Sequence, residues 1–190
     1  MTAQISDSFR CGDKEYSVIA MSEPIDFNPG HYGLKPFYTC TACYTGYWCA
    51  YNISENGIML EKLFIHTLDG NYPEIAGVAP SGEDEACLGH RLYNNINLKI
   101  NYTGKILVGD EFIEEYYIHM GTQRPWAYKV LIELVFENGE LTEKNDKSHL
   151  AAELREMLRK KADKNLTREE TEYYMNILRS INFGGQRFRH

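Results

Sequence analysis

Long apolar segments and the common catalytic motifs are both missing from this chain of 190 residues. The longest stretch without a charged residue is Pro36–Ser54. It is too rich in Thr, Asn and Ser to form a membrane-spanning helix of about 20 apolar residues. Residues 1–7 lack the basic and apolar regions of a signal peptide. We therefore expect a soluble, cytoplasmic protein with no membrane partner.

Phosphate-binding loops, dinucleotide fingerprints, H-E-x-x-H and G-x-S-x-G motifs do not occur in the sequence. The composition, with 43% apolar and 25% charged residues, excludes a wholly disordered or collagen-like chain. The length corresponds to one domain that is large enough to bury its own core. Any function must therefore be inferred from charge and from clusters of side chains.

Basic residues are scarce in the first three-quarters of the chain. Residues 1–146 contain 10 Lys and Arg against 21 Asp and Glu, a net charge of −11. Residues 147–190 contain 10 basic and 6 acidic residues, a net charge of +4. Nucleic-acid affinity comes mainly from Lys and Arg that neutralise phosphates, so the acidic part argues against a nucleic-acid partner. It favours a basic protein partner instead.

Alternating apolar residues and turn signals predict a β-rich body. Asn56-Gly57 and Asn138-Gly139 are typical of hairpin turns, because both central residues must accept a positive φ. Gly109-Asp110 is read as the end of a strand. The predicted strands are 14–21, 46–53, 58–65, 95–102, 105–108, 112–120 and 128–136.

After residue 146 the apolar period becomes helical. One stripe runs from Leu150 to Leu158 and a second from Tyr174 to Ile181, and Thr167 with Glu170 forms a capping box. The predicted fold is α+β: a mostly antiparallel, curved or barrel-like sheet over about residues 8–145, followed by two amphipathic helices. We expect one domain, with residues 1–146 as an acidic body and 147–190 as a helical appendage packed on it.

The most specific set of chemical side chains is sulfur and imidazole. Cys40 and Cys43 form a C-x₂-C pair, and Cys87 and His90 form a C-x₂-H pair. Three thiolates and one imidazole can complete a tetrahedral zinc site, which would be structural because no coordination position remains open. The two pairs are far apart in sequence, however, and the alternative is cysteines that pack as small apolar residues or remain reduced thiols.

Four residues near one loop are candidate binding residues: Glu115, His119, Arg124 and Trp126. If residues 112–120 form a strand, Glu115 and His119 share a face, and a carboxylate beside an imidazole suits acid–base chemistry. The Arg124 guanidinium suits recognition of carboxylates or phosphates. The alternative is a solvated strand edge followed by a plain connection whose Trp126 packs inward.

The leading hypothesis is a non-catalytic binding protein that docks a basic protein partner, for which an immunity-type inhibitor would have suitable charge. Its tyrosines and tryptophans would provide interface anchors. The alternative is an enzyme or sensor with an aromatic-lined small-molecule pocket in the sheet. A second alternative is a zinc-stabilised scaffold, and self-association through the C-terminal helices is a further expectation.

Overall fold

The structure is a computed structural model that describes residues 2–54, 57–83, 89–162 and 167–181. Its strands are β1 (Ser8–Cys11), β2 (Lys14–Met21), β3 (Tyr47–Ser54), β4 (Gly57–Ile65), β5 (Gly82–Glu83), β6 (Arg91–Ile100), β7 (Gly104–Phe112), β8 (Tyr128–Glu137) and β9 (Glu140–Asp146). Three short 3₁₀ helices are η1 (Pro29–Tyr32), η2 (Glu114–Tyr116) and η3 (Pro125–Ala127). The chain continues with the helices α1 (Ser148–Ala162) and α2 (Arg168–Ile181).

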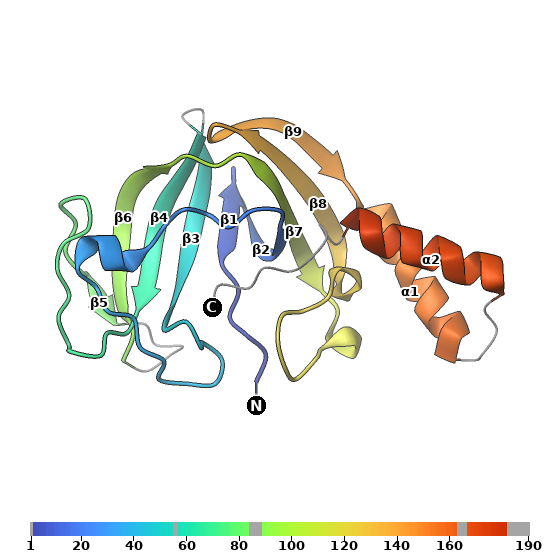
Figure 1. The fold of residues 1–190 in the computed structure, drawn as a ribbon, viewed down its shortest axis with the longest axis horizontal. Helices are drawn as coiled ribbons and strands as arrows, with labels where there is room; N and C mark the ends of the chain where they lie inside the picture. The colour runs from blue at the N-terminus through green and yellow to red at the C-terminus, as the bar shows by residue number, and fades with distance from the viewer. Residues whose placement is uncertain (1, 55–56, 84–88, 163–166, 182–190) are drawn as a thin grey trace.

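All nine strands belong to one sheet in the order β5-β6-β4-β3-β1-β2-β7-β8-β9. Neighbouring strands are antiparallel except for β1 and β3, which are parallel. The sheet arches strongly, but β5 and β9 remain its two edges, so it does not close into a barrel (Figure 1). The predicted α+β class, with a curved, mostly antiparallel sheet and two C-terminal helices, is confirmed.

Two hairpins meet at one end of the arch. The backbone N–H of Ile58 in β4 donates to the carbonyl oxygen of Gly139, between β8 and β9, at 3.0 Å. The N–H of Gly139 donates in turn to the carbonyl oxygen of Tyr102, at 2.7 Å. These bonds hold the β8–β9 hairpin against the opposite side of the sheet and fix its curvature at this end.

The concave face of the sheet is filled with side chains. Phe9, Tyr51 and Phe136 are fully buried there, and the ring centroids of Phe9 and Tyr51 lie 5.0 Å apart. Segments that cross the arch between strands contribute further buried residues to the same core: Ile25, Phe27, Leu34 and Ile75. Burial of this apolar area is the main stabilising contribution to the fold.

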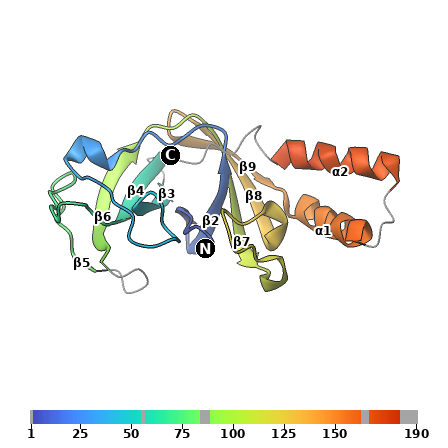
Figure 2. The same ribbon diagram turned by 60° about the horizontal axis from the view of Figure 1, so that its bottom comes forward.

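A second core lies on the opposite face of β2, β7 and β8, where α1 packs. Ala151 and Leu154 of α1 are fully buried against residues such as Leu131. Tyr174 and Ile177 of α2 join this core. The two helices lie side by side and extend away from the sheet (Figure 1 and Figure 2).

The predicted strand ends are wrong in the β7 region. Gly109 and Asp110 do not end a strand but lie within β7, paired with β8. A Cβ at Gly109 would lie only 2.6 Å from Cγ of Tyr128, so glycine serves here for the close approach of a ring and not for a turn. Residues 112–120 form no strand: only Phe112 belongs to β7, and the segment continues through η2. The strand predicted at 95–102 begins earlier, at Arg91.

The helix signals are confirmed. Asp146 accepts a hydrogen bond from the backbone N–H of Ser148 at 2.8 Å and so caps the start of α1. Before α2, the N–H of Glu170 donates to Thr167 Oγ1 at 3.2 Å, and the N–H of Thr167 donates to Glu170 Oε2 at 3.0 Å. These two bonds are the reciprocal pair of a capping box. Within the described part of the chain, neither helix has the length and apolar character needed to cross a membrane.

Candidate functional site

The four predicted binding residues lie in the connection between β7 and β8. Glu115 is in η2, Trp126 is in η3, and His119 and Arg124 lie between them. Glu115, His119 and Arg124 are exposed, whereas Trp126 is half-buried against the second core. Because the carboxylate, imidazole and guanidinium all face solvent on one loop, the arrangement does not resemble an enclosed catalytic site.

The same loop lies close to Arg159 of α1. Arg159 faces Tyr116, Glu156 and Glu115, and these groups raise the pKa of its guanidinium in that order of strength. Arg159 also forms an ion pair with Glu156 at 2.7 Å. The imidazole of His119 instead packs edge-on against the Tyr117 ring, with centroids 5.1 Å apart. Glu115 and His119 therefore meet different neighbours, and the structure does not pair them.

The predicted zinc ligands are only partly visible. Cys40 and Cys43 lie in one turn, in which the N–H of Cys43 donates to the carbonyl of Cys40 at 3.2 Å. Cys87 lies outside the described residues, and His90 is fully buried. Among the residues that are described, no three His, Cys, Asp or Glu side chains are grouped as metal ligands. The four-ligand set stays a prediction, and the four described cysteines form no disulfide bond.

His90 belongs to an aromatic cluster that the sequence did not reveal. Its ring lies 5.0 Å from that of Trp48 and 6.0 Å from that of His66. Trp48 also stacks on Phe64, with centroids 4.8 Å apart and planes 6° from parallel. The detectable signal was the β3–β4 hairpin, whose register places Trp48 directly opposite Phe64.

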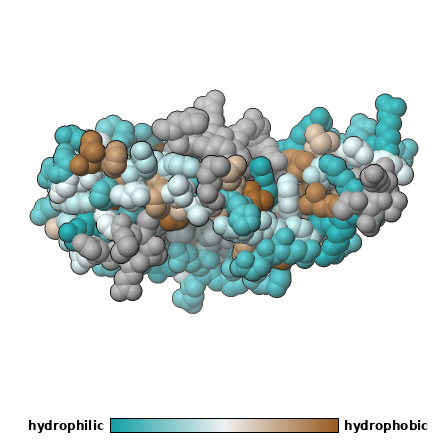
Figure 3. Space-filling model, turned by 90° about the horizontal axis from the view of Figure 1, so that it is seen from below, coloured by the Kyte–Doolittle hydropathy of each residue, from teal (hydrophilic) through white to brown (hydrophobic). Residues whose placement is uncertain are grey.

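Exposed apolar side chains occur on three segments at the end of the arch opposite the hairpin contact. The N-terminal segment joins two loops there, because the N–H of Gln4 donates to the carbonyl of Gly121 at 3.0 Å and the N–H of Ile5 to that of Ala42 at 2.8 Å. Figure 3 looks at this end and shows apolar residues in separate patches among polar ones. The exposed large residues on these three segments are Ile5, Phe37, Tyr38, Tyr44, Tyr117 and Met120.

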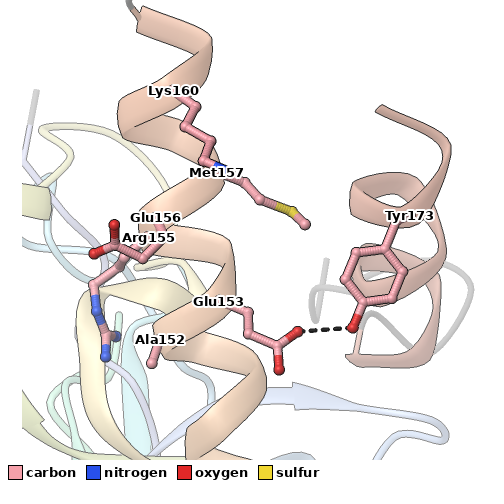
Figure 4. Close-up of a pocket in the computed structure, with 7 residues that line it drawn as sticks. All are labelled: Ala152, Glu153, Arg155, Glu156, Met157, Lys160 and Tyr173. Atoms are coloured by element: carbon pink, nitrogen blue, oxygen red, sulfur yellow. Dashed lines mark hydrogen bonds between the residues drawn. The ribbon is translucent and has the colours of Figure 1, made fainter. Parts of the chain in front are cut away.

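An open groove of about 590 Å³ lies between α1 and α2 (Figure 4). Ala152 and Met157 contribute apolar surface to it. Tyr173 of α2 donates a hydrogen bond to Glu153 Oε2 of α1 at 2.9 Å, which raises the pKa of the phenol. None of the four predicted binding residues lines this groove. Its other polar lining residues are already engaged: Lys160 pairs with Glu170 of α2, Glu156 pairs with Arg159 of α1, and Arg155 donates to backbone carbonyls of the sheet side. The groove therefore offers no chemistry beyond that of a helix pair.

Three exposed carboxylates without an ion pair among the described residues lie along the β8–β9 hairpin. Glu137, Glu140 and Glu143 are all exposed. The register places Glu137 of β8 directly opposite Glu140 of β9, and Val135 of β8 opposite Glu143 of β9. Val135 and Glu137 are two residues apart in one strand, so their side chains lie on the same face of the sheet. All three glutamates therefore share that face. Within the described residues none of these three carboxylates forms an ion pair. Sequence analysis found the acidic excess but not this location.

Comparison of the chain with protein-family models, with curated proteins and with solved structures finds no match. The functional argument therefore depends on the residues and geometry described above.

Proposed function

We propose that this protein is a non-catalytic binding protein whose acidic body docks a basic protein partner. The observation that carries the proposal is the way the charges are paired. Cations of the helical segment form ion pairs within the helices: Arg159 with Glu156 at 2.7 Å and Lys160 with Glu170 at 3.0 Å. Among the described residues, the ion pairs of the helical segment leave most of the acidic excess of residues 1–146 without a partner.

Ion pairs within the body involve few of its carboxylates. Among the described residues, Arg10, Lys35, Lys105 and Lys129 pair with carboxylates of the body. The helical segment reaches the body through Lys147, whose Nζ lies 3.8 Å from Glu133 Oε1, while Lys105 lies 3.7 Å from the other oxygen of the same buried carboxylate. The remaining exposed carboxylates in the described part of the body are therefore available to a partner.

Such a charge distribution favours fast association with a basic protein. Complementary charge raises the rate of encounter, and this effect weakens as salt screens the field. Exposed rings such as those of Tyr38 and Tyr44 supply the kind of side chain that anchors protein interfaces. An immunity-type inhibitor of a basic enzyme has these requirements and is the specific form of the proposal.

The test is affinity capture with the full chain, followed by reconstitution with the purified protein that is retained. We expect a partner of net positive charge that binds with defined stoichiometry, and an association rate that falls steeply between low and physiological salt. A control chain with four exposed carboxylates changed to Gln should associate more slowly at low salt. Retention of small metabolites alone, or of a partner whose association rate ignores salt, would count against the proposal.

A further inference from the structure

The two edges of the sheet differ in length. β5 contains two residues, whereas β9 contains seven and pairs with β8 on one side. An edge strand presents backbone N–H and carbonyl groups on its open side, where another extended segment can form a ladder with them. Among the described residues, β5 pairs only with Leu92 and Arg91 of β6, and beyond them β6 is irregular because Asn95 and Asn97 have positive φ. β9 has one register shift, at Thr142, but otherwise follows β8 from Glu140 to Asp146. β9 is therefore the more regular edge for an added strand.

β9 is held in a defined conformation by contacts on its other sides. Lys144 extends over the concave face, where its Nζ lies 3.8 Å from Cys11 Sγ and 6.0 Å from the centre of the Tyr16 ring. Thr142 Oγ1 donates to the carbonyl of Val135 at 3.2 Å. The Asn145 amide donates to the carboxylates of Glu133 at 3.3 Å and Glu143 at 3.1 Å. An ordered edge reduces the entropy lost when a segment adds to it.

The charges on this edge decide what can add to it. Glu137, Glu140 and Glu143 share the convex face, and like charges directly opposite each other destabilise a strand pair. A second copy of β9 would bring an equally acidic face to this edge. Carboxylates therefore oppose pairing between two copies, as charged side chains do on many edge strands. A strand with Lys or Arg on the facing positions would relieve the same repulsion.

We propose that the open edge of β9 binds an extended, Lys- or Arg-bearing segment of the partner as an additional strand. This inference rests on the proposed function and specifies the surface and the chemistry of the ligand. Main-chain hydrogen bonds to β9 supply affinity, and cations opposite Glu140 and Glu143 supply selectivity. An acidic or neutral extended segment can form the main-chain hydrogen bonds but not the charge pairs.

The test uses the full chain and an eight-residue peptide in which Lys alternates with Thr. A second peptide has the same sequence with every backbone amide N-methylated, which keeps the charge and removes the strand donors. We expect the unmodified peptide to bind at least about tenfold more tightly, since each lost hydrogen bond weakens binding by about fivefold. It should also slow amide hydrogen exchange within β9.

Matched double variants distinguish peptide binding at this edge from attraction by the overall charge. Glu140→Gln with Glu143→Gln should weaken binding of the unmodified peptide about fivefold, as expected for two cross-strand charge pairs. Glu74→Gln with Glu114→Gln removes the same charge from exposed positions outside the β8–β9 hairpin and should change binding less than twofold. Circular dichroism checks that both double variants fold.

Equal binding of the two peptides, or equal weakening by the two double variants, overturns strand addition at β9. Both results leave the proposed function intact, because overall charge attraction still supports a basic partner. If a captured basic protein binds the β9 variant as tightly as the unchanged chain, the edge is likewise excluded as the docking site. Failure to capture any basic protein, with peptide binding retained, counts against the proposed function alone.

Discussion

Arg155 of α1 donates a hydrogen bond from Nη1 to the backbone carbonyl of Tyr128 in β8 at 2.8 Å. The same nitrogen donates to the carbonyl of Trp126 at 3.0 Å. A charged donor thus joins the helical segment to η3 and to the start of β8. This contact holds the middle of α1 against the end of the loop that contains the predicted binding residues.

Changing Arg155 to Met keeps most of the apolar stem but removes the donors. We expect the free energy of unfolding to fall by about 2 kcal/mol, because a charge-assisted hydrogen bond is lost and two carbonyls lose their partner. Denaturant unfolding monitored by circular dichroism measures the change. Arg159→Met is the matched control, because its exposed ion pair with Glu156 contributes little. Equal losses of unfolding free energy in the two variants would mean that the Arg155 hydrogen bonds stabilise the fold no more than an exposed ion pair does.

The hairpin contact at the end of the arch predicts a difference between two glycines. Gly139 has a φ of +86°, and a Cβ there would lie 2.7 Å from the carbonyl oxygen of Ile100. Gly12 has a φ of +64° and nothing within 4 Å of the same position. Gly139→Ala combines a left-handed backbone with a backbone clash, and we expect a loss of about 3 kcal/mol in unfolding free energy.

Gly12→Ala is the control, because it retains the backbone cost without the clash and should lose about 1 kcal/mol. Thermal and denaturant unfolding of the two variants give the comparison. A smaller loss at Gly139 than at Gly12 would mean that the β8–β9 hairpin is not held against β4 and Tyr102 as the hydrogen bonds indicate.

Local signals predicted much of this fold. The apolar pattern of Lys14–Met21 predicted β2, Asn56-Gly57 predicted the β3–β4 hairpin, and Thr167 with Glu170 predicted the start of α2. Each of these depends on interactions between residues that are close in sequence. A single strand or cap carries enough side-chain pattern to be recognised without knowledge of its partners.

Features that depend on distant pairing were not predictable. β1 is only four residues long, and its parallel pairing with β3 joins residues about 40 positions apart. Gly109 looked like a turn residue because its contact with Tyr128 cannot be read from neighbouring residues. The acidic excess was visible in the composition, but placing Glu137 opposite Glu140 requires the β8–β9 register.

Alkaline pH should destabilise the protein through its buried phenols. Burial raises the pKa of Tyr93 to about 12, with a smaller contribution from Tyr72, and burial also raises the pKa values of Tyr102 and Tyr128. The unfolded phenol titrates near 10, so between about pH 10 and 12 the folded state binds more protons. Stability is therefore fully present below pH 10 and falls as the pH rises toward 12.

Tyr93→Phe tests whether the buried Tyr93 phenol contributes to the loss of stability above pH 10. The variant should unfold more easily at neutral pH, because the phenol donates to the carbonyl of Pro73 at 2.8 Å, but its stability should fall less steeply above pH 10. Unfolding free energies between pH 9 and 12, with phenolate absorbance followed in parallel, measure the slope. Tyr38→Phe removes the hydroxyl of an exposed phenol and is the control. An unchanged slope in the Tyr93 variant would contradict the prediction.

The Cys40–Cys43 turn places two thiols of different accessibility side by side. Cys43 is buried, and burial raises the pKa of its thiol despite an opposing contact with Thr45 Oγ1 at 3.8 Å, whereas Cys40 is half-buried. Alkylation requires the thiolate and access to it, so at pH 8 we expect Cys40 to react about tenfold faster than Cys43. Mass spectrometry of partially alkylated protein measures both rates in one sample.

The same experiment tests the predicted zinc site. If Cys40 and Cys43 bind zinc together with Cys87 and His90, added zinc slows alkylation of all three cysteines together, because a metal-bound thiolate is protected. Cys11 lies outside the predicted set and is the internal control, so its rate should not change. Unchanged rates at Cys40 and Cys43, with zinc content near zero per chain, would remove the site. The slow reaction of Cys43 would then follow from burial alone.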